Sequence, residues 1–169
     1  MVEPLHINEQ MRQTMFIPDH TLALFFGMSK FDNVYKQTKN GLYEPYFENL
    51  PEAKDDCDDL KNCLKHYNLA EENCYDLSNN PTLKEIQVVW QKIRNRIKKG
   101  FNSQPMIKYT VIFLYAGHGM LMDGNQVLVL NEWDKENGFY KLYQAEQQLR
   151  MLASTYSNCY IIGIFACCR

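Results

Sequence analysis

The chain has 169 residues, 46% of them hydrophobic and 22% charged, and a formal net charge of −2. This length predicts one domain with one core. The balanced charge argues against nucleic acid or an anionic membrane surface as a partner, and no apolar run approaches the roughly 20 residues of a membrane-spanning helix. The N-terminus lacks the pattern of a secretory signal peptide. Because six cysteines without secretory context indicate reduced thiols, we expect a cytoplasmic protein.

Strands are predicted where apolar residues run continuously and are rich in branched and aromatic side chains. The three clearest runs are residues 21–26, 110–115 and 160–165. A shorter run at residues 74–77 is a candidate fourth strand. Continuous apolar strands are typical of parallel sheets that are buried on both faces. We therefore expect a sheet with helices packed against both of its faces.

Helices are predicted between these strands, where apolar residues recur at spacings of three and four over residues 51–67, 82–99 and 140–155. Thr82 is the expected cap of the second helix. Asp123 and Gly124 predict a hairpin turn after the third strand. The element order predicts an α/β fold, a three-layer α/β/α sandwich around a mostly parallel sheet.

Two residues with catalytic chemistry follow two of the predicted strands. His118 lies between Gly117 and Gly119 after the strand at 110–115, and Cys168 follows the strand at 160–165. Ligands bind at the carboxyl ends of such sheets. If these strands are neighbours, about 4.8 Å apart, the imidazole and the thiol lie at the same edge. The imidazole would then activate the thiol, and the N–H of Gly119 would face a developing oxyanion.

Residues 111–119, together with residues 162–169, resemble the caspase, metacaspase and paracaspase group of cysteine peptidases. Cys168 follows His118 by 50 residues, which matches the spacing of the caspase signature. Residues 21–27 and 50–60 are similar to the family's first strand and to its loop into the first helix. The resemblance implies a caspase-like, large-subunit-like domain over residues 20–169, after an N-terminal extension of residues 1–19.

This resemblance implies a cysteine endopeptidase that hydrolyses peptide or protein substrates through a thioester acyl-enzyme, without a cofactor or metal ion. The family's arginine directly follows its catalytic cysteine, as Arg169 follows Cys168, so the resemblance assigns the nucleophile to Cys168 and not to Cys167. It assigns the role of acid and base to His118. The backbone amides of Gly119 and Cys168 would form the oxyanion hole.

Three features depart from the family pattern. Ala166, a candidate substrate-binding residue, stands where caspases have glutamine and the other groups commonly aspartate. The arginine that gives caspases their aspartate preference falls near Leu50, so we do not expect that preference here. The family fold continues past the position of Arg169, so we expect the domain to be incomplete at its C-terminus. The alternative is an inactive caspase-like interaction or regulatory protein, paired with a C-terminal small-subunit-like chain or with a second copy.

The sequence gives little support for a metal site or for nucleic-acid binding. Cys57, Cys63 and His66 lack the paired-cysteine spacing of zinc sites. The acidic stretch at residues 52–59 lacks the glycine and alternation of a calcium loop, although calcium activates many metacaspases. A solvated start of a helix explains that stretch better. Trp90 and Trp133 are expected in the core or the groove wall, where they would not stack on bases.

Overall fold

The computed structural model describes residues 17–32, 35–37, 39–41, 43–45, 47–104, 106–122, 125–134 and 139–167. Its main sheet has four parallel strands in the order β4-β1-β5-β9. These strands are β1 (Thr21–Gly27), β4 (Cys74–Leu77), β5 (Tyr109–Ala116) and β9 (Cys159–Ala166). Each strand coincides with an apolar run of the sequence, so the predicted parallel sheet is confirmed.

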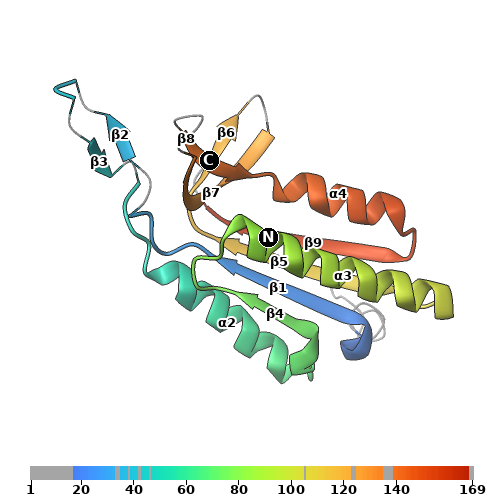
Figure 1. The fold of residues 1–169 in the computed structure, drawn as a ribbon. Coiled ribbons are helices and arrows are strands. Elements are labelled where there is room, and N and C mark those ends of the chain that lie inside the picture. The colour runs from blue at the N-terminus through green and yellow to red at the C-terminus, as the bar shows by residue number, and fades with distance from the viewer. Residues whose placement is uncertain are drawn as a thin grey trace, which may run out of the picture.

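Helices cover the two faces of this sheet (Figure 1). Helix α2 (Glu52–His66) packs on one face, against β1 and β5. Helices α3 (Leu83–Ser103) and α4 (Ala145–Thr155) pack on the other. Two short 3-10 helices, η1 (Pro18–His20) and η2 (Glu71–Asn73), precede β1 and β4. The predicted three-layer α/β/α arrangement is therefore confirmed.

The two central strands supply both halves of the core, because alternate residues of a strand point to opposite faces. On one face, side chains of β1 and β5 pack against side chains of α2. The strand residues are Ala23, Phe25, Ile112 and Leu114, and the helix residues are Ala53, Cys57 and Leu64. On the other face, side chains of the same two strands pack against side chains of α3 and α4. The strand residues are Leu22, Leu24, Phe26, Val111, Phe113 and Tyr115, and the helix residues are Ile86, Trp90, Ile93, Ile97, Leu149 and Leu152. Both layers of helices are therefore held by the same pair of buried strands.

Helix α3 begins at the predicted cap. The Thr82 hydroxyl accepts a 3.3 Å hydrogen bond from the backbone N–H of Glu85, and the Glu85 carboxylate accepts one of 2.7 Å from the backbone N–H of Thr82. This reciprocal pair satisfies two N–H groups that the start of a helix leaves without partners. The helix continues to Ser103, beyond the predicted end at residue 99.

Two small antiparallel sheets lie at the carboxyl ends of the main strands (Figure 1). Strands β2 (Tyr35–Gln37) and β3 (Tyr43–Pro45) form the first, and β6 (Gly119–Met122), β7 (Asn125–Asp134) and β8 (Phe139–Tyr143) form the second. The expected turn at residues 123–124 lies outside the described residues, and the strands beside it pair as a hairpin.

Part of this region corrects the sequence analysis. The strands β2, β3 and β8 were not expected, and residues 140–143 were assigned to the third helix. They belong to β8, and α4 begins at Ala145. Pairing with β7 decides the conformation of this segment, since tertiary contacts routinely override local propensity.

Strand β9 also differs from the expectation of burial on both faces. Tyr160, Ile162 and Ile164 are 54%, 45% and 39% exposed. They share the face that α2 covers on the neighbouring strands, and no helix among the described residues reaches them. The reason is the position of β9 at the end of the sheet: among the residues that the structure describes, it pairs with β5 along one side and has no strand on the other.

Candidate active site

The carboxyl ends of β5 and β9 lie side by side. The two strands are parallel neighbours, and Ala116 pairs with Ala166 at the end of the register. The backbone N–H of Gly117 continues the ladder with a 3.2 Å bond to the carbonyl of Ala166. His118 therefore lies just beyond the last paired residues. Cys168 and Arg169 lie outside the described residues, and Cys167, directly before them, is partly buried against the core on the α3 side.

A glycine is required between β5 and His118. Gly117 has a φ of +155°, which residues with side chains rarely adopt. A Cβ atom built at this position would lie only 2.6 Å from the hydroxyl oxygen of Tyr115. The backbone between β5 and His118 therefore takes a conformation that glycine permits and a residue with a side chain does not.

The backbone of His118 is held by two hydrogen bonds. Its carbonyl oxygen accepts a 2.6 Å bond from the Tyr115 hydroxyl and a 3.0 Å bond from the N–H of Val129. Burial raises the pKa of Tyr115 well above its ordinary value, so its hydroxyl remains a neutral donor. Gly119, the predicted oxyanion donor, begins β6 opposite Leu128.

The imidazole of His118 has a defined partner. Its Nε2 lies 2.8 Å from the backbone carbonyl oxygen of Glu48. A carbonyl oxygen only accepts hydrogen bonds, so Nε2 carries the proton of this contact. In the neutral ring, Nδ1 is then the nitrogen with a lone pair available to take a proton.

Two phenylalanine rings pack against the imidazole of His118. The Phe47 ring stacks on His118 with centroids 4.8 Å apart and an interplanar angle of 30°. Phe31 meets it edge-on at 4.7 Å. The backbone N–H of Phe31 is anchored in turn by a 2.7 Å bond to Oδ1 of Asn49. These contacts restrict rotation of the imidazole about its side-chain bonds.

The remaining predicted site residues in the described part of the chain lie near this histidine. Leu50 follows Glu48 by two residues, and its N–H bonds to the carbonyl of Ser29 just after β1. Ala166 is exposed at the end of β9. The structure thus gathers His118, Gly119, Leu50 and Ala166 at the carboxyl ends of β1, β5 and β9.

Four contributors to the site were missed from the sequence: the carbonyl of Glu48 and the side chains of Phe31, Phe47 and Tyr115. A backbone carbonyl has no signal in the sequence, because every residue carries one. Phe31 and Phe47 lie in a segment without helical or strand periodicity. Tyr115 lies in the apolar run at residues 110–115, and only its hydroxyl distinguishes it from the other core side chains of that run.

Across the described residues, no group of three or more His, Cys, Asp and Glu side chains is arranged to hold a metal ion. Cys57 lies on the buried face of α2, whereas Cys63 and His66 lie on its exposed face, so these three side chains do not converge. None of the helices in this part of the chain is long and apolar enough to cross a membrane.

Comparison with known proteins identifies the family. The family model of the caspase domain matches residues 20–169. No curated protein and no solved structure matches the chain. The parallel sheet with helices on both faces, and the glycine-flanked histidine after β5, agree with this match. The chain therefore belongs to the caspase domain family, a family of cysteine peptidases.

Proposed function

We propose that this protein is a cysteine endopeptidase in which Cys168 is the nucleophile and His118 is the acid and base. The observation that carries the proposal is the contact between Nε2 of His118 and the carbonyl of Glu48, 2.8 Å long. This contact fixes the tautomer that leaves Nδ1 available for the thiol proton. The parallel register of β5 and β9 supports the pairing, since both residues follow the matched ends of these strands.

In the proposed reaction, Nδ1 of His118 takes the proton of the Cys168 thiol as the sulfur attacks the carbonyl carbon of a peptide bond. The backbone N–H groups of Gly119 and Cys168 stabilise the negative oxygen of the tetrahedral intermediate. The leaving amine receives the proton from His118, and a thioester remains on Cys168. Water then attacks the thioester with His118 as base, which releases the acid and restores the thiol.

The substrate side chain before the cleaved bond would lie near Leu50 and Ala166. Neither residue carries a charge, and Leu50 packs partly into the core. A carboxylate placed there would lose its hydration without gaining an ionic partner from these two residues. We therefore expect no preference for substrates with aspartate at this position.

Competitive labelling with iodoacetamide tests the dyad. Cys63 is exposed and serves as an internal reference, because each peptide can be quantified by mass spectrometry in the same sample. At pH 7 an unactivated thiol is only a few per cent ionised, so we expect Cys168 to react roughly tenfold faster than Cys63. His118→Ala should remove this advantage and leave the rate at Cys63 unchanged. Equal rates at the two cysteines in the unmodified protein would contradict the proposal.

A second candidate function is that of a non-catalytic interaction protein. The exposed apolar row on β9, formed by Tyr160, Ile162 and Ile164, favours it, because an edge strand with an apolar face is suited to pairing with another chain. A C-terminal small-subunit-like chain or a second copy would be the partner. Peptide hydrolysis that disappears in Cys168→Ala would exclude the non-catalytic function. Concentration-dependent association without hydrolysis would favour it, with Ile162→Lys expected to weaken that association.

A further inference from the structure

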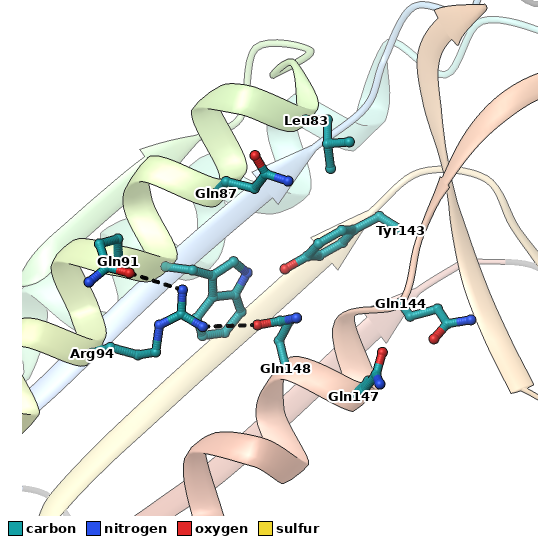
Figure 2. Close-up of a pocket in the computed structure, with 9 residues that line it drawn as sticks. Leu83, Gln87, Gln91, Arg94, Tyr143, Gln144, Gln147 and Gln148 are labelled. Atoms are coloured by element: carbon teal, nitrogen blue, oxygen red, sulfur yellow. Dashed lines mark hydrogen bonds between the residues drawn. The ribbon is translucent and has the colours of Figure 1, made fainter. Parts of the chain in front are cut away.

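A polar pocket lies between helices α3 and α4, outside the site around His118. Its volume is about 550 Å³, within the range of roughly 300–1,000 Å³ that is usual for small-ligand sites. One stripe of α3 faces the end of β8 and the first turns of α4 across it (Figure 2). The lining residues are Leu83, Gln87, Trp90, Gln91, Arg94, Tyr143, Gln144, Gln147 and Gln148.

Arg94 is the cation of this pocket, and its partners are neutral. Its guanidinium donates to the amide oxygens of Gln91 and Gln148, each at 3.3 Å (Figure 2). Both distances exceed the usual length of an N–H···O bond. None of the ion pairs found in the described parts of the chain includes Arg94. A carboxylate would replace these long contacts with shorter, charge-assisted bonds, because it matches the guanidinium in a bidentate manner.

Two buried donors in the pocket wall also lack partners. Trp90 is 2% exposed and Tyr143 is 7% exposed, and neither the indole N–H nor the hydroxyl makes a hydrogen bond with the residues that the structure describes. The Tyr143 hydroxyl points into the space between the helices (Figure 2). Burial raises the pKa of Tyr143, so its hydroxyl keeps the proton and acts as a neutral donor. An acceptor on a ligand would satisfy donors that the protein leaves unpaired.

The surrounding charges favour an anion. Helix α4 begins at the pocket with Gln144 as its N-cap and no side-chain cap, and this end of a helix attracts negative charge. The nearby carboxylates are already used: Glu132 binds the N–H of Leu83, and Glu146 pairs with Arg150. Helix α3 carries one acidic side chain, that of Glu85, against six basic ones: Lys84, Lys92, Arg94, Arg96, Lys98 and Lys99.

The lining also limits the class of ligand. The Trp90 ring is buried and stacks on Phe113 at 5.9 Å, so it offers no open face to a nucleobase. Five glutamine amides line the pocket, and each provides both a donor and an acceptor, as a peptide group does. From this donor-rich, cationic lining we infer that the pocket binds a short acidic peptide segment, with its carboxylate on Arg94 and its backbone on the glutamines.

Calorimetric titration of the full chain with acetyl-Gly-Asp-Gly-amide tests this inference. The peptide acetyl-Gly-Asn-Gly-amide, which has no carboxylate, is the matched control. Inorganic phosphate tests whether a simple anion binds as well. Cys168→Ala is used as the background, so that hydrolysis does not interfere. We expect the Asp peptide to bind at least roughly tenfold more tightly than the Asn peptide, because the latter lacks a charge-assisted bond. The indole N–H resonance of Trp90, assigned with Trp133→Phe, should shift on binding.

Two variants on the same helix distinguish binding in the pocket from general electrostatic attraction to a basic helix. Arg94→Gln should weaken binding of the Asp peptide roughly tenfold or more, whereas Lys92→Gln, an equal loss of charge on the exposed face, should change it less than about twofold. Tyr143→Phe should weaken binding without destabilising the unbound protein, since its hydroxyl has no partner there. Equal affinity for the two peptides, equal effects of Arg94→Gln and Lys92→Gln, or tighter binding of phosphate would overturn the inference.

Discussion

The hydroxyl of Tyr115 donates a 2.6 Å hydrogen bond to the backbone carbonyl of His118, three residues farther along the chain. Tyr115 is fully buried, and its ring packs edge-on against Phe26 at 5.0 Å. The segment that carries the proposed catalytic base is thereby tied to the core on the α3 side. The position of His118 consequently depends on a side chain that cannot reach the substrate.

Replacing Tyr115 with phenylalanine tests this tie. The change keeps the ring and removes the donor to the carbonyl of His118, so we expect a loss of about 1–2 kcal/mol in the free energy of unfolding. Urea titration followed by circular dichroism measures it. Tyr160→Phe, on the exposed face of β9, is the control and should leave stability unchanged. Equal stability of the two variants would show that the bond contributes nothing.

Gly117→Ala is expected to destabilise the protein by roughly 2–4 kcal/mol, because a residue with a side chain is strained at this φ and also collides with Tyr115. Gly163→Ala is the matched control. A Cβ atom there would meet the far end of the Phe165 ring at 3.0 Å, and no φ in the left-handed region is involved, so the loss should stay below about 1 kcal/mol. Thermal unfolding of the pair distinguishes strain at Gly117 from a general effect of the extra methyl group.

Phe47 is predicted to be a positioning residue for His118. Phe47→Ala removes the stacked ring and lets the imidazole rotate, so iodoacetamide labelling of Cys168 should slow roughly tenfold. Phe47→Tyr keeps the ring and should retain the rate. Phe101→Ala, which removes a ring packed on Tyr156, is the control for general loss of packing. If Phe47→Ala and Phe101→Ala slow labelling equally, the stacking has no specific role.

Stability should fall at alkaline pH because of a buried thiol. Burial is the main cause that raises the pKa of Cys57 from 9.0 to about 12, and nearby carboxylates add to it. Above pH 9 the unfolded chain loses this proton while the folded chain retains it. The free energy of unfolding should therefore decrease as pH rises from 9 towards 12, by at most about 1.4 kcal/mol per pH unit for this thiol.

Denaturant titrations between pH 8 and pH 11 measure this decrease. Cys57→Ala should show a shallower slope, although its stability at pH 8 will be lower because a cavity forms under α2. Cys63→Ala, on the exposed side of the same helix, should leave the slope as it is in the unmodified protein. An identical slope in the unmodified protein and Cys57→Ala would assign the alkaline effect to other groups.

Much of the fold follows from local patterns. The apolar runs at β1, β5 and β9, the stripe of Ile86, Trp90, Ile93 and Ile97 on α3, and the cap at Thr82 are readable because burial and capping impose short-range periodicities. The position of β8 was not readable in this way. Its helical spacing competes with pairing to β7, and the partner strand decides the outcome.

The sequence by itself determined the family, the α/β class and the two residues proposed for catalysis. The apolar patterns of the strands and helices can be recognised locally, and so can a histidine or a cysteine directly after a buried strand. Only the tertiary structure decided that the carbonyl of Glu48 and the rings of Phe31 and Phe47 hold His118, and that one face of β9 is exposed. The physical reason is the same in each case. These features depend on which segments meet in space, and a backbone carbonyl, a loop aromatic or the edge of a sheet carries no spacing that shows its partner.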